Sequence, residues 1–330
     1  MFIYFLLFLL YPCTFAAYLS FMSIIVSVNH LHKEFNGVKA VNDLSFTVNE
    51  GDVYGFLGQN GAGKSTSIRM MLTLIKPDSG SIRIFGKELT RYRNEVLSQT
   101  GAIIERPDLY KYLSAYENLA IFARLSGIKT SRKLLMDQLE KVGLAERYNS
   151  KVKTFSQGMK QRLGIAVALV HDPKLIILDE PTNGLDPQGI ADMRNLIINL
   201  SSLHGKTVIV SSHLLSEIEM MANRMIIIDR GKKIAEGSVT EMMDPSATIV
   251  QLESTNDSYT RSLIQQSAWA PHLESSDTIR FRMNKKDIPQ LAAWLVGKEV
   301  GIISLQPRHS LEDYFLSLTN PENYVEPVSN

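Results

Sequence analysis

The chain has 330 residues, of which 45% are apolar and 21% are charged, and its formal net charge is +1 at pH 7. This length and apolar content suffice for one large domain or two with buried cores. The near-neutral charge excludes an extended basic surface for nucleic acid. The single cysteine, Cys13, excludes an internal disulfide.

The first segment is an apolar extension over residues 1–22. No Lys, Arg, Asp or Glu precedes Lys33. About 20 apolar residues can span a bilayer, so the extension could be an anchor, and Lys33 would then favour a cytoplasmic domain. A signal peptide fits poorly because the positive first region is missing. We favour Met22 as the true start, because "SIIVSVNHLHKEF" from Ser23 already predicts a strand and leaves no linker after an anchor.

Residues 23–240 are predicted to form one α/β domain with a mostly parallel sheet. Apolar runs typical of buried parallel strands occur at 52–58, 174–180, 206–213 and 224–231. After the first run, apolar residues from Ile68 to Ile75 have helical spacing, and Pro77 is expected to stop that helix. Strand signals are absent from about 107 to 172, which predicts a helical insert.

A second, smaller α/β domain is predicted over residues 245–320, with a loose tail at 321–330. Strands are expected in 248–254, 278–283 and 301–308, and helices in 260–270, 287–296 and 310–318. The last helix has Ser310 and Asp313 as a capping pair. We expect this domain to contribute to regulation or to dimer contact.

A glycine-rich loop, "GQNGAGKST", follows the run at 52–58 and fits the pattern G-x-x-x-x-G-K-[ST] in full. Glycines let backbone N–H groups surround phosphates, and the following helix directs its positive end at them. The lysine reaches the outer phosphates and the serine hydroxyl can ligate Mg²⁺. The predicted nucleotide-binding residues are Gly58, Gln59, Asn60, Gly61, Ala62, Gly63, Lys64, Ser65 and Thr66.

Two acidic residues, Asp179 and Glu180, directly follow the apolar run "LIIL". An aspartate at the end of a strand can hold Mg²⁺. The next carboxylate can orient or deprotonate an attacking water. The phosphate loop upstream favours this catalytic interpretation over an ordinary polar strand end.

A second candidate phosphate site is the start of a predicted helix in "TFSQGMKQRLGIA". Ser156 and Gly158 lie where backbone N–H groups are free to meet an anion. By itself, "FSQG" predicts an ordinary helix N-cap, and only the other motifs favour the phosphate site.

The ordered set of motifs resembles the ABC-type ATPases, the nucleotide-binding subunits of ABC transporters, over about residues 23–240. "FSQGMKQR" stands at the position of the family signature, and "LIILDEPTNGLDP" contains the Walker B strand and the D-loop around Gly184 to Asp186. "VIVSSH" ends in the switch histidine, His213, and Phe35 stands at the position of the aromatic residue that stacks on adenine. A buried core aromatic is the alternative for Phe35.

The resemblance implies a P-loop NTPase that binds ATP and Mg²⁺. Two subunits would pack head to tail, so that each phosphate loop faces the partner's signature with ATP between them. The resemblance implies catalytic roles for Glu180 and His213 and metal contacts for Ser65, Glu105 and Asp179. Residues expected to face the partner's nucleotide are Ser156, Gln157, Gly158 and Asp186.

Two departures from the family pattern stand out. Gln157 replaces the first signature glycine, and Met159 replaces the usual glutamine, although Ser156 and Gly158 remain. Glu105 replaces the glutamine of the Q-loop; a carboxylate is still a hard ligand for Mg²⁺, but it cannot donate a hydrogen bond when ionised. Glu105 could instead only link strand to helix.

Within the family, the C-terminal extension and the segments "GAIIERPDLYKYLSAYENL" and "FSQGMKQRLGIAVAL" are most similar to the bacitracin and lantibiotic export group. The similarity implies a subunit at the cytoplasmic face of the membrane that powers a separate permease, which would meet the insert near Tyr110 to Tyr116. The alternatives are an importer, another drug or polysaccharide exporter, a soluble ABC protein acting on ribosomes or DNA, or a module that binds ATP without hydrolysis.

Overall fold

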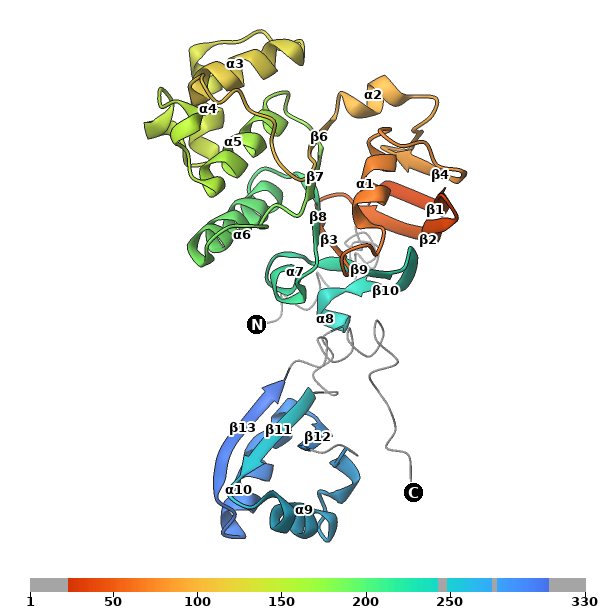
Figure 1. The fold of residues 1–330 in the computed structure, drawn as a ribbon, viewed down its shortest axis with the longest axis vertical. Coiled ribbons are helices and arrows are strands. Elements are labelled where there is room, and N and C mark those ends of the chain that lie inside the picture. Colours follow the sequence, from red (N-terminus) through yellow and green to blue (C-terminus); the bar gives the residue numbers. More distant parts are fainter. Residues whose placement is uncertain (1–22, 243–247, 275–277, 309–330) are drawn as a thin grey trace, which may run out of the picture.

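The computed structural model describes residues 23–242, 248–274 and 278–308 (Figure 1). The predictions for residues 1–22, the helix at 310–318 with its capping pair, and the tail at 321–330 lie outside the described residues. The mostly parallel sheet, the helical insert and the small C-terminal α/β part are all present, so the predicted fold class is confirmed.

The central sheet has six strands in the order β10-β9-β3-β8-β7-β6. Five are parallel, and β10 pairs with β9 in the antiparallel direction. The bounds are β3 Val53–Leu57, β6 Thr100–Ile103, β7 Leu175–Asp179, β8 Thr207–Ser212, β9 Arg224–Asp229 and β10 Lys232–Ser238. The four predicted apolar runs are therefore strands of this sheet, and β6 and β10 are additional.

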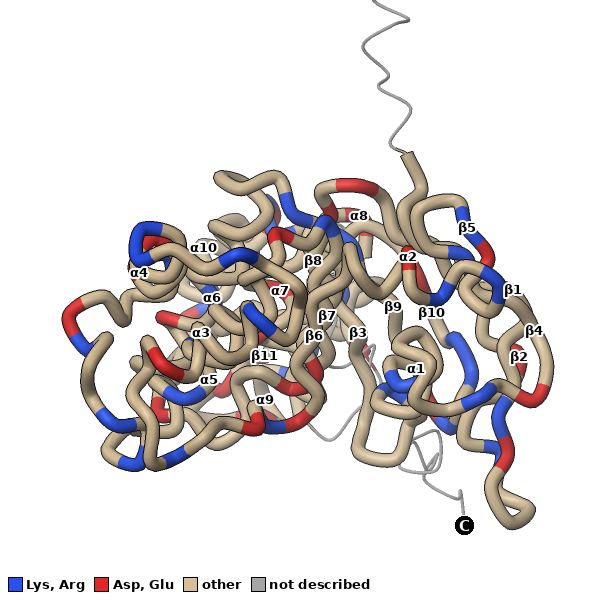
Figure 2. The backbone as a smooth tube through the Cα atoms, turned by 90° about the horizontal axis from the view of Figure 1, so that it is seen from above, with Lys and Arg blue, Asp and Glu red and all other residues tan. Residues whose placement is uncertain are grey.

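Each face of this sheet has its own apolar core, because successive side chains of a strand point to opposite faces. Phe56 and Ile177 pack on one face with α1 (Lys64–Met71), while Leu57 and Ile176 pack on the other with α5 (Gln157–Leu169). Figures 1 and 2 both show α1 and the helical insert on opposite sides of the sheet. The phosphate loop and the signature therefore belong to different layers of one chain.

A four-stranded antiparallel sheet covers the α1 side, in the order β2-β1-β4-β5. Its strands are β1 Ile24–Phe35, β2 Val38–Asn49, β4 Ser79–Ile84 and β5 Lys87–Glu88, followed by the short helix α2 (Arg93–Leu97). The sequence predicted the first strand only. The prediction that the helix after the phosphate loop extends towards Pro77 is wrong: α1 ends at Met71, and Thr73 adopts a left-handed φ of 59°.

Three helices form the insert: α3 (Ala115–Leu125), α4 (Arg132–Lys141) and α5. A serine caps each of them, with Ser114, Ser131 and Ser156 accepting bonds from the first helical turn. On the same face of the sheet lie α6 (Pro187–Ser202) and α7 (Leu215–Met221). Together these helices bury one continuous apolar core.

The C-terminal part has its own sheet, β12-β11-β13, and its own core around Phe281 and Leu291. The elements are β11 Thr248–Ser254, α9 Asp257–Gln265, β12 Ile279–Met283, α10 Ile288–Gly297 and β13 Ile302–Arg308, and α8 (Val239–Met242) precedes them. The predicted helix at 260–270 is misplaced, because Asn256 caps α9 and starts it at Asp257.

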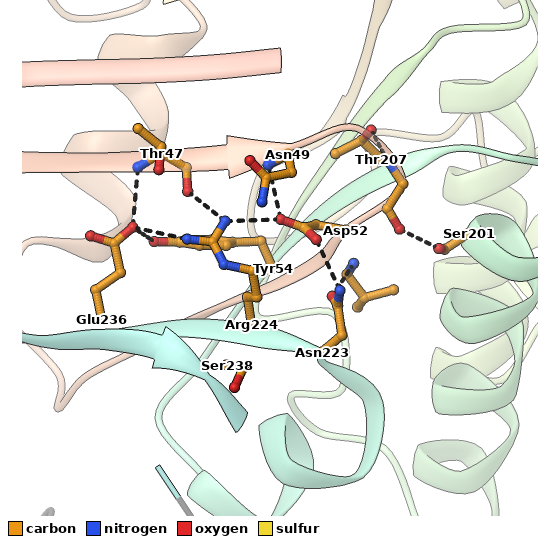
Figure 3. A network of polar contacts seen from close by, with 12 residues as sticks. Thr47, Asn49, Asp52, Tyr54, Ser201, Thr207, Asn223, Arg224, Glu236 and Ser238 are labelled. Carbon is orange, nitrogen blue, oxygen red and sulfur yellow. Dashed lines mark hydrogen bonds and ion pairs between the residues drawn. The ribbon is translucent and has the colours of Figure 1, made fainter. Parts of the chain in front are cut away.

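A polar network joins the central sheet to the antiparallel sheet at the end away from the phosphate loop (Figure 3). The guanidinium of Arg224 lies 3.1 Å from Asp52 and 3.7 Å from Glu236, and it donates to the carbonyl of Thr47 at 3.2 Å. The Tyr54 hydroxyl donates to Glu236 at 2.9 Å. Burial, together with the Glu236 carboxylate, raises the pKa of Tyr54 well above its ordinary value, so this hydroxyl remains a donor.

Removing the cation of this network should destabilise the protein. Because Asp52 is buried, Arg224→Met would leave its carboxylate without a cation, and we expect the free energy of unfolding to fall by about 3 kcal/mol. Chemical denaturation measures this change. The exposed Arg83 on β4 provides the matched control, and Arg83→Met should change stability by less than about 0.5 kcal/mol. Equal effects of the two substitutions would contradict this account.

Candidate functional site

The phosphate loop spans the turn between β3 and α1, and its glycines have conformations that other residues avoid. Gly61 and Gly63 have φ of 83° and 103°, and a Cβ on Gly63 would lie 2.4 Å from the carbonyl oxygen of Ala40. The first turn of α1 contains Lys64, Ser65 and Thr66, where backbone N–H groups lack intrahelical partners. This geometry suits an anion at the start of α1.

Lys64 connects the loop to the strand end that carries the two acids. Its side chain is 5% exposed, and its ammonium donates to the carbonyl of Gly58 at 2.6 Å and, more weakly, to that of Gln59 at 3.3 Å. The ammonium also lies 3.1 Å from Glu180 Oε1, an ion-pair distance without hydrogen-bond alignment. A phosphate entering the loop would therefore compete with Glu180 for this cation.

Asp179 ends β7 with one of its oxygens unpaired. Oδ1 accepts a bond of 2.6 Å from Ser211, whereas Oδ2 is buried without a hydrogen-bond partner. Such a buried acceptor is costly unless something binds it. The donor set of Asp179 and Ser65 fits Mg²⁺, which prefers hard oxygen ligands.

Glu180 and His213 face each other across the ends of β7 and β8. His213 Nδ1 lies 2.8 Å from Glu180 Oε2. The Ser211 hydroxyl, which donates to Asp179, also accepts a bond of 2.9 Å from the Glu180 backbone N–H. Glu180 has a left-handed φ of 50°. Its Oε1 is buried without a hydrogen-bond partner and lies at ion-pair distance from Lys64, so it could orient a water only once that cation is drawn away.

The signature residues lie at the start of α5, as the sequence predicts. Ser156 Oγ accepts the Met159 N–H at 3.2 Å, and Gln157 and Gly158 form the first turn. A Cβ on Gly158 would lie 3.8 Å from Leu185, so the signature lies beside the D-loop segment. The next D-loop residue, Asp186, caps α6 by accepting the Gly189 N–H at 3.2 Å.

Phe35 ends β1 with 44% of its surface exposed, so the alternative that it is a core residue is wrong. The Lys33 ammonium lies 5.2 Å from its ring centroid. An exposed ring beside a cation can stack on a flat base.

Glu105 follows β6 in a left-handed conformation, with φ of 59°. Its carboxylate pairs with Arg69 at the end of α1, and its carbonyl accepts a long bond of 3.5 Å from Gln161 of α5. The loop therefore touches both the helix after the phosphate loop and the signature helix. The negative charge that Glu105 has in place of the usual glutamine is thus balanced by Arg69, and a neutral amide at this position would not need that cation.

Sequence reasoning missed two residues of this site, Ser211 and Arg69. Ser211 aligns both acids through its hydroxyl, and its signal was the polar pair that ends the apolar run "VIVSS". The sequence offers no comparable signal for Arg69, because its partner lies 36 residues away.

Comparison with known proteins agrees with this geometry. The family described as "ABC transporter" matches residues 41–183. The bacitracin transport ATP-binding protein BcrA of Bacillus licheniformis is 40% identical over 305 residues, covering 90% of this chain and 98% of that protein. The lantibiotic transport ATP-binding protein SrtF of Streptococcus pyogenes is 43% identical over 64% of this chain and 90% of that protein. Among solved structures, CbiO1 of Clostridium perfringens, part of an ABC transporter complex, has 27% identity and a TM-score of 0.62 over 66% of this chain and 90% of that one.

The phosphate loop, the paired acids and the surrounding sheet define a P-loop NTPase. The chain belongs to the family of ABC transporter ATP-binding proteins and is an ATPase of that class. No helix within residues 23–242, 248–274 or 278–308 combines the length and apolar character needed to cross a membrane.

Lys64→Ala should weaken ATP binding, because the loop would lose its only charged donor to the outer phosphates. Hydrogen bonds to charged groups contribute about 1.5–3 kcal/mol, so we expect the dissociation constant to rise about 10-fold or more. Titration with a fluorescent ATP analogue measures it. Lys129→Ala, at an exposed lysine of the insert, is the control, and a similar loss of affinity in both variants would contradict the role of Lys64.

Proposed function

We propose that the chain is the ATP-hydrolysing subunit of an ABC exporter that moves a peptide antibiotic or similar amphiphile through a separate permease. Lys64, Glu180 and His213 lie together beyond the carboxyl ends of β3, β7 and β8, and this arrangement supports ATP hydrolysis. The near full-length similarity to a bacitracin transport protein supports the export of this class of substrate.

In this mechanism the phosphates bind in the glycine loop and replace Glu180 as the ion-pair partner of the Lys64 ammonium. Glu180, oriented by His213 on one oxygen, would then use its free Oε1 to align or deprotonate the attacking water. Mg²⁺ held by Ser65 and Asp179 would neutralise charge on the outer phosphates. Phe35 would stack on the adenine.

The placement of α1 and α5 supports a head-to-tail dimer. The helices α1 and α5 lie on opposite sides of the central sheet (Figure 2). The start of α5, with Ser156, Gln157 and Gly158, is therefore in a different layer from the phosphate loop of its own subunit. A second copy would place its signature and Asp186 against that loop. ATP would lie between the two subunits.

The permease is proposed to meet the insert at the segment before α3. Tyr110 and Tyr112 are 51% and 78% exposed there. A cavity of about 170 Å³ lies at the start of this segment, lined by residues that include Arg106, Pro107 and Phe122, and the Phe122 ring lies 6.1 Å from that of Tyr110. Because Glu105 precedes this segment directly, the permease contact would be linked to the nucleotide site. The subunit would then be held at the cytoplasmic face of the membrane through the permease.

Glu180→Gln tests catalysis and transport together. Hydrolysis should slow about 100-fold or more because the amide cannot take a proton. ATP affinity should be retained or increased, because the neutral amide no longer competes with the phosphates for the Lys64 ammonium. In a host strain that lacks the chain, the wild type should restore tolerance to bacitracin and E180Q should not. An unchanged turnover would reject Glu180 as the base, and a wild-type chain that hydrolyses ATP without altering tolerance to any peptide antibiotic would reject the export assignment.

A mixing experiment tests the shared site. Lys64→Ala and Ser156→Arg subunits should each be inactive alone, yet a heterodimer contains one composite site with both residues intact. Random pairing should therefore restore about a quarter of the wild-type ATPase rate. No recovery on mixing, with dimerisation verified by light scattering, would show that each nucleotide is bound within one chain.

A further inference from the structure

We propose that Glu217 is a positioning residue of the ATPase site, which fixes the segment after Glu180 to the strand end that carries His213. The proposal rests on the hydrolysis assigned above. It concerns a side chain that belongs to neither the phosphate loop nor the acid pair, and lies in the first turn of α7.

One oxygen of Glu217 holds two hydroxyl groups from separate elements. Oε2 accepts the Thr182 hydroxyl at 2.6 Å and the Ser212 hydroxyl at 2.9 Å. All three residues are buried, with 6%, 4% and 1% of their surfaces exposed for Glu217, Thr182 and Ser212. Bonds of this length to a shielded carboxylate are the strong, charge-assisted kind.

Thr182 belongs to the turn that runs from the catalytic carboxylate to the D-loop. It follows Glu180 by two residues, and its carbonyl accepts the Leu185 N–H at 3.1 Å. That bond closes the turn around Gly184, whose φ is 75°. Leu185 in turn lies next to the signature residue Gly158. Fixing Thr182 therefore fixes the chain between Glu180 and the proposed partner-facing residues.

Ser212 holds the other side of the connection, directly before His213. Its hydroxyl also accepts the Leu214 N–H at 3.0 Å, so the backbone on both sides of His213 depends on one side chain. Its carbonyl accepts the Gly58 N–H at 3.3 Å, at the first residue of the phosphate loop. Glu217 thus connects D-loop, switch histidine and phosphate loop through two hydroxyls.

The chemistry of the cluster argues against a role in stability alone. The interactions found for Glu217 in the described part of the chain are with hydroxyls, and an apolar side chain would be easier to bury there than a carboxylate. The helix itself is already held by Leu215, Ile218 and Met221 in the apolar core. A buried acceptor on a helix held by the core joins two segments that are separate in the chain.

The consequence is that movement of the D-loop and the orientation of His213 are linked. When the partner's approach displaces the segment at 182–186, Thr182 and Ser212 can move together only if both stay bonded to Glu217. The His213 ring, 2.8 Å from Glu180, would then keep its distance to the base during closure.

The test is steady-state ATPase kinetics of full-length variants, with thermal melting and ATP binding measured alongside. Glu217→Met removes the acceptor at similar length, and Thr182→Val removes one donor at the same shape. Each should lower kcat about 10-fold or more, because a small misplacement of catalytic groups has effects of this size. ATP affinity should stay within about threefold, since the phosphate loop is untouched.

Conservative variants separate positioning from packing. Glu217→Gln and Thr182→Ser keep an acceptor and a donor, so both should retain most of the wild-type kcat. The double variant T182V/E217M should be no slower than E217M, because both changes break the same connection. Ser212→Ala removes the second hydroxyl bonded to Glu217 and should also lower kcat. Ser216→Ala removes an exposed hydroxyl on α7, the helix of Glu217, and as the matched control it should keep the wild-type kcat.

The proposal is overturned if T182V and S212A keep wild-type kcat, or if all losses follow the melting temperature and the folded fraction. T182V covers the case in which E217M does not fold. This outcome differs from a failure of the proposed function. If the wild type itself does not hydrolyse ATP, the proposed function is wrong. If both the wild type and T182V hydrolyse ATP at the same rate, only the role of Glu217 is wrong.

Discussion

The parallel register of β3, β7 and β8 is the constraint on which the site depends. Leu57 pairs with Ser212, and Asp179 pairs with Ser211, so three strands end within one or two residues of each other. The phosphate loop, the two acids and the switch histidine each follow one of these ends directly. Loops positioned by a rigid sheet can differ in conformation while their functional side chains stay together. A slip of one residue between β7 and β8 would turn Ser211 away from Asp179, and a slip between β3 and β8 would shift the acids relative to Lys64.

The contacts of Lys64 and Glu180 show a site whose charges satisfy one another before a nucleotide binds. The cation contacts loop carbonyls and the Glu180 carboxylate, and that carboxylate contacts His213. Phosphate binding would exchange one anion for another at Lys64, so this buried cation has an anionic partner in either state. The same exchange would release Glu180 Oε1 as the phosphates arrive, which ties activation of the base to occupancy of the loop.

Local patterns predicted the strands and the phosphate loop, and long-range contacts were beyond them. Runs such as "LIIL" identify buried strands directly. In β2, buried residues such as Leu44 and Phe46 alternate with polar ones, so a search for continuous apolar runs does not detect it. The roles proposed for Lys64, Asp179 and Glu180 are predictions from motif and spacing. The pairing of Arg69 with Glu105 and the two bonds of Glu217 depend on chain crossings that no local pattern records. Phe35 needed the structure to decide between core and surface.

The two helical layers that cover opposite faces of the central sheet explain why a single chain has two helix starts suited to phosphate. Each apolar face is closed by its own helices, so α1 and α5 are separated by the sheet and held there by different cores. A rearrangement that brought both to one nucleotide within the chain would have to break one of these cores, which is far more costly than the free energy a nucleotide contributes. A symmetric pair needs no such rearrangement, because a twofold axis places each α5 opposite the other chain's α1. The packing of one subunit therefore favours the proposed arrangement, in which a second copy would complete the site.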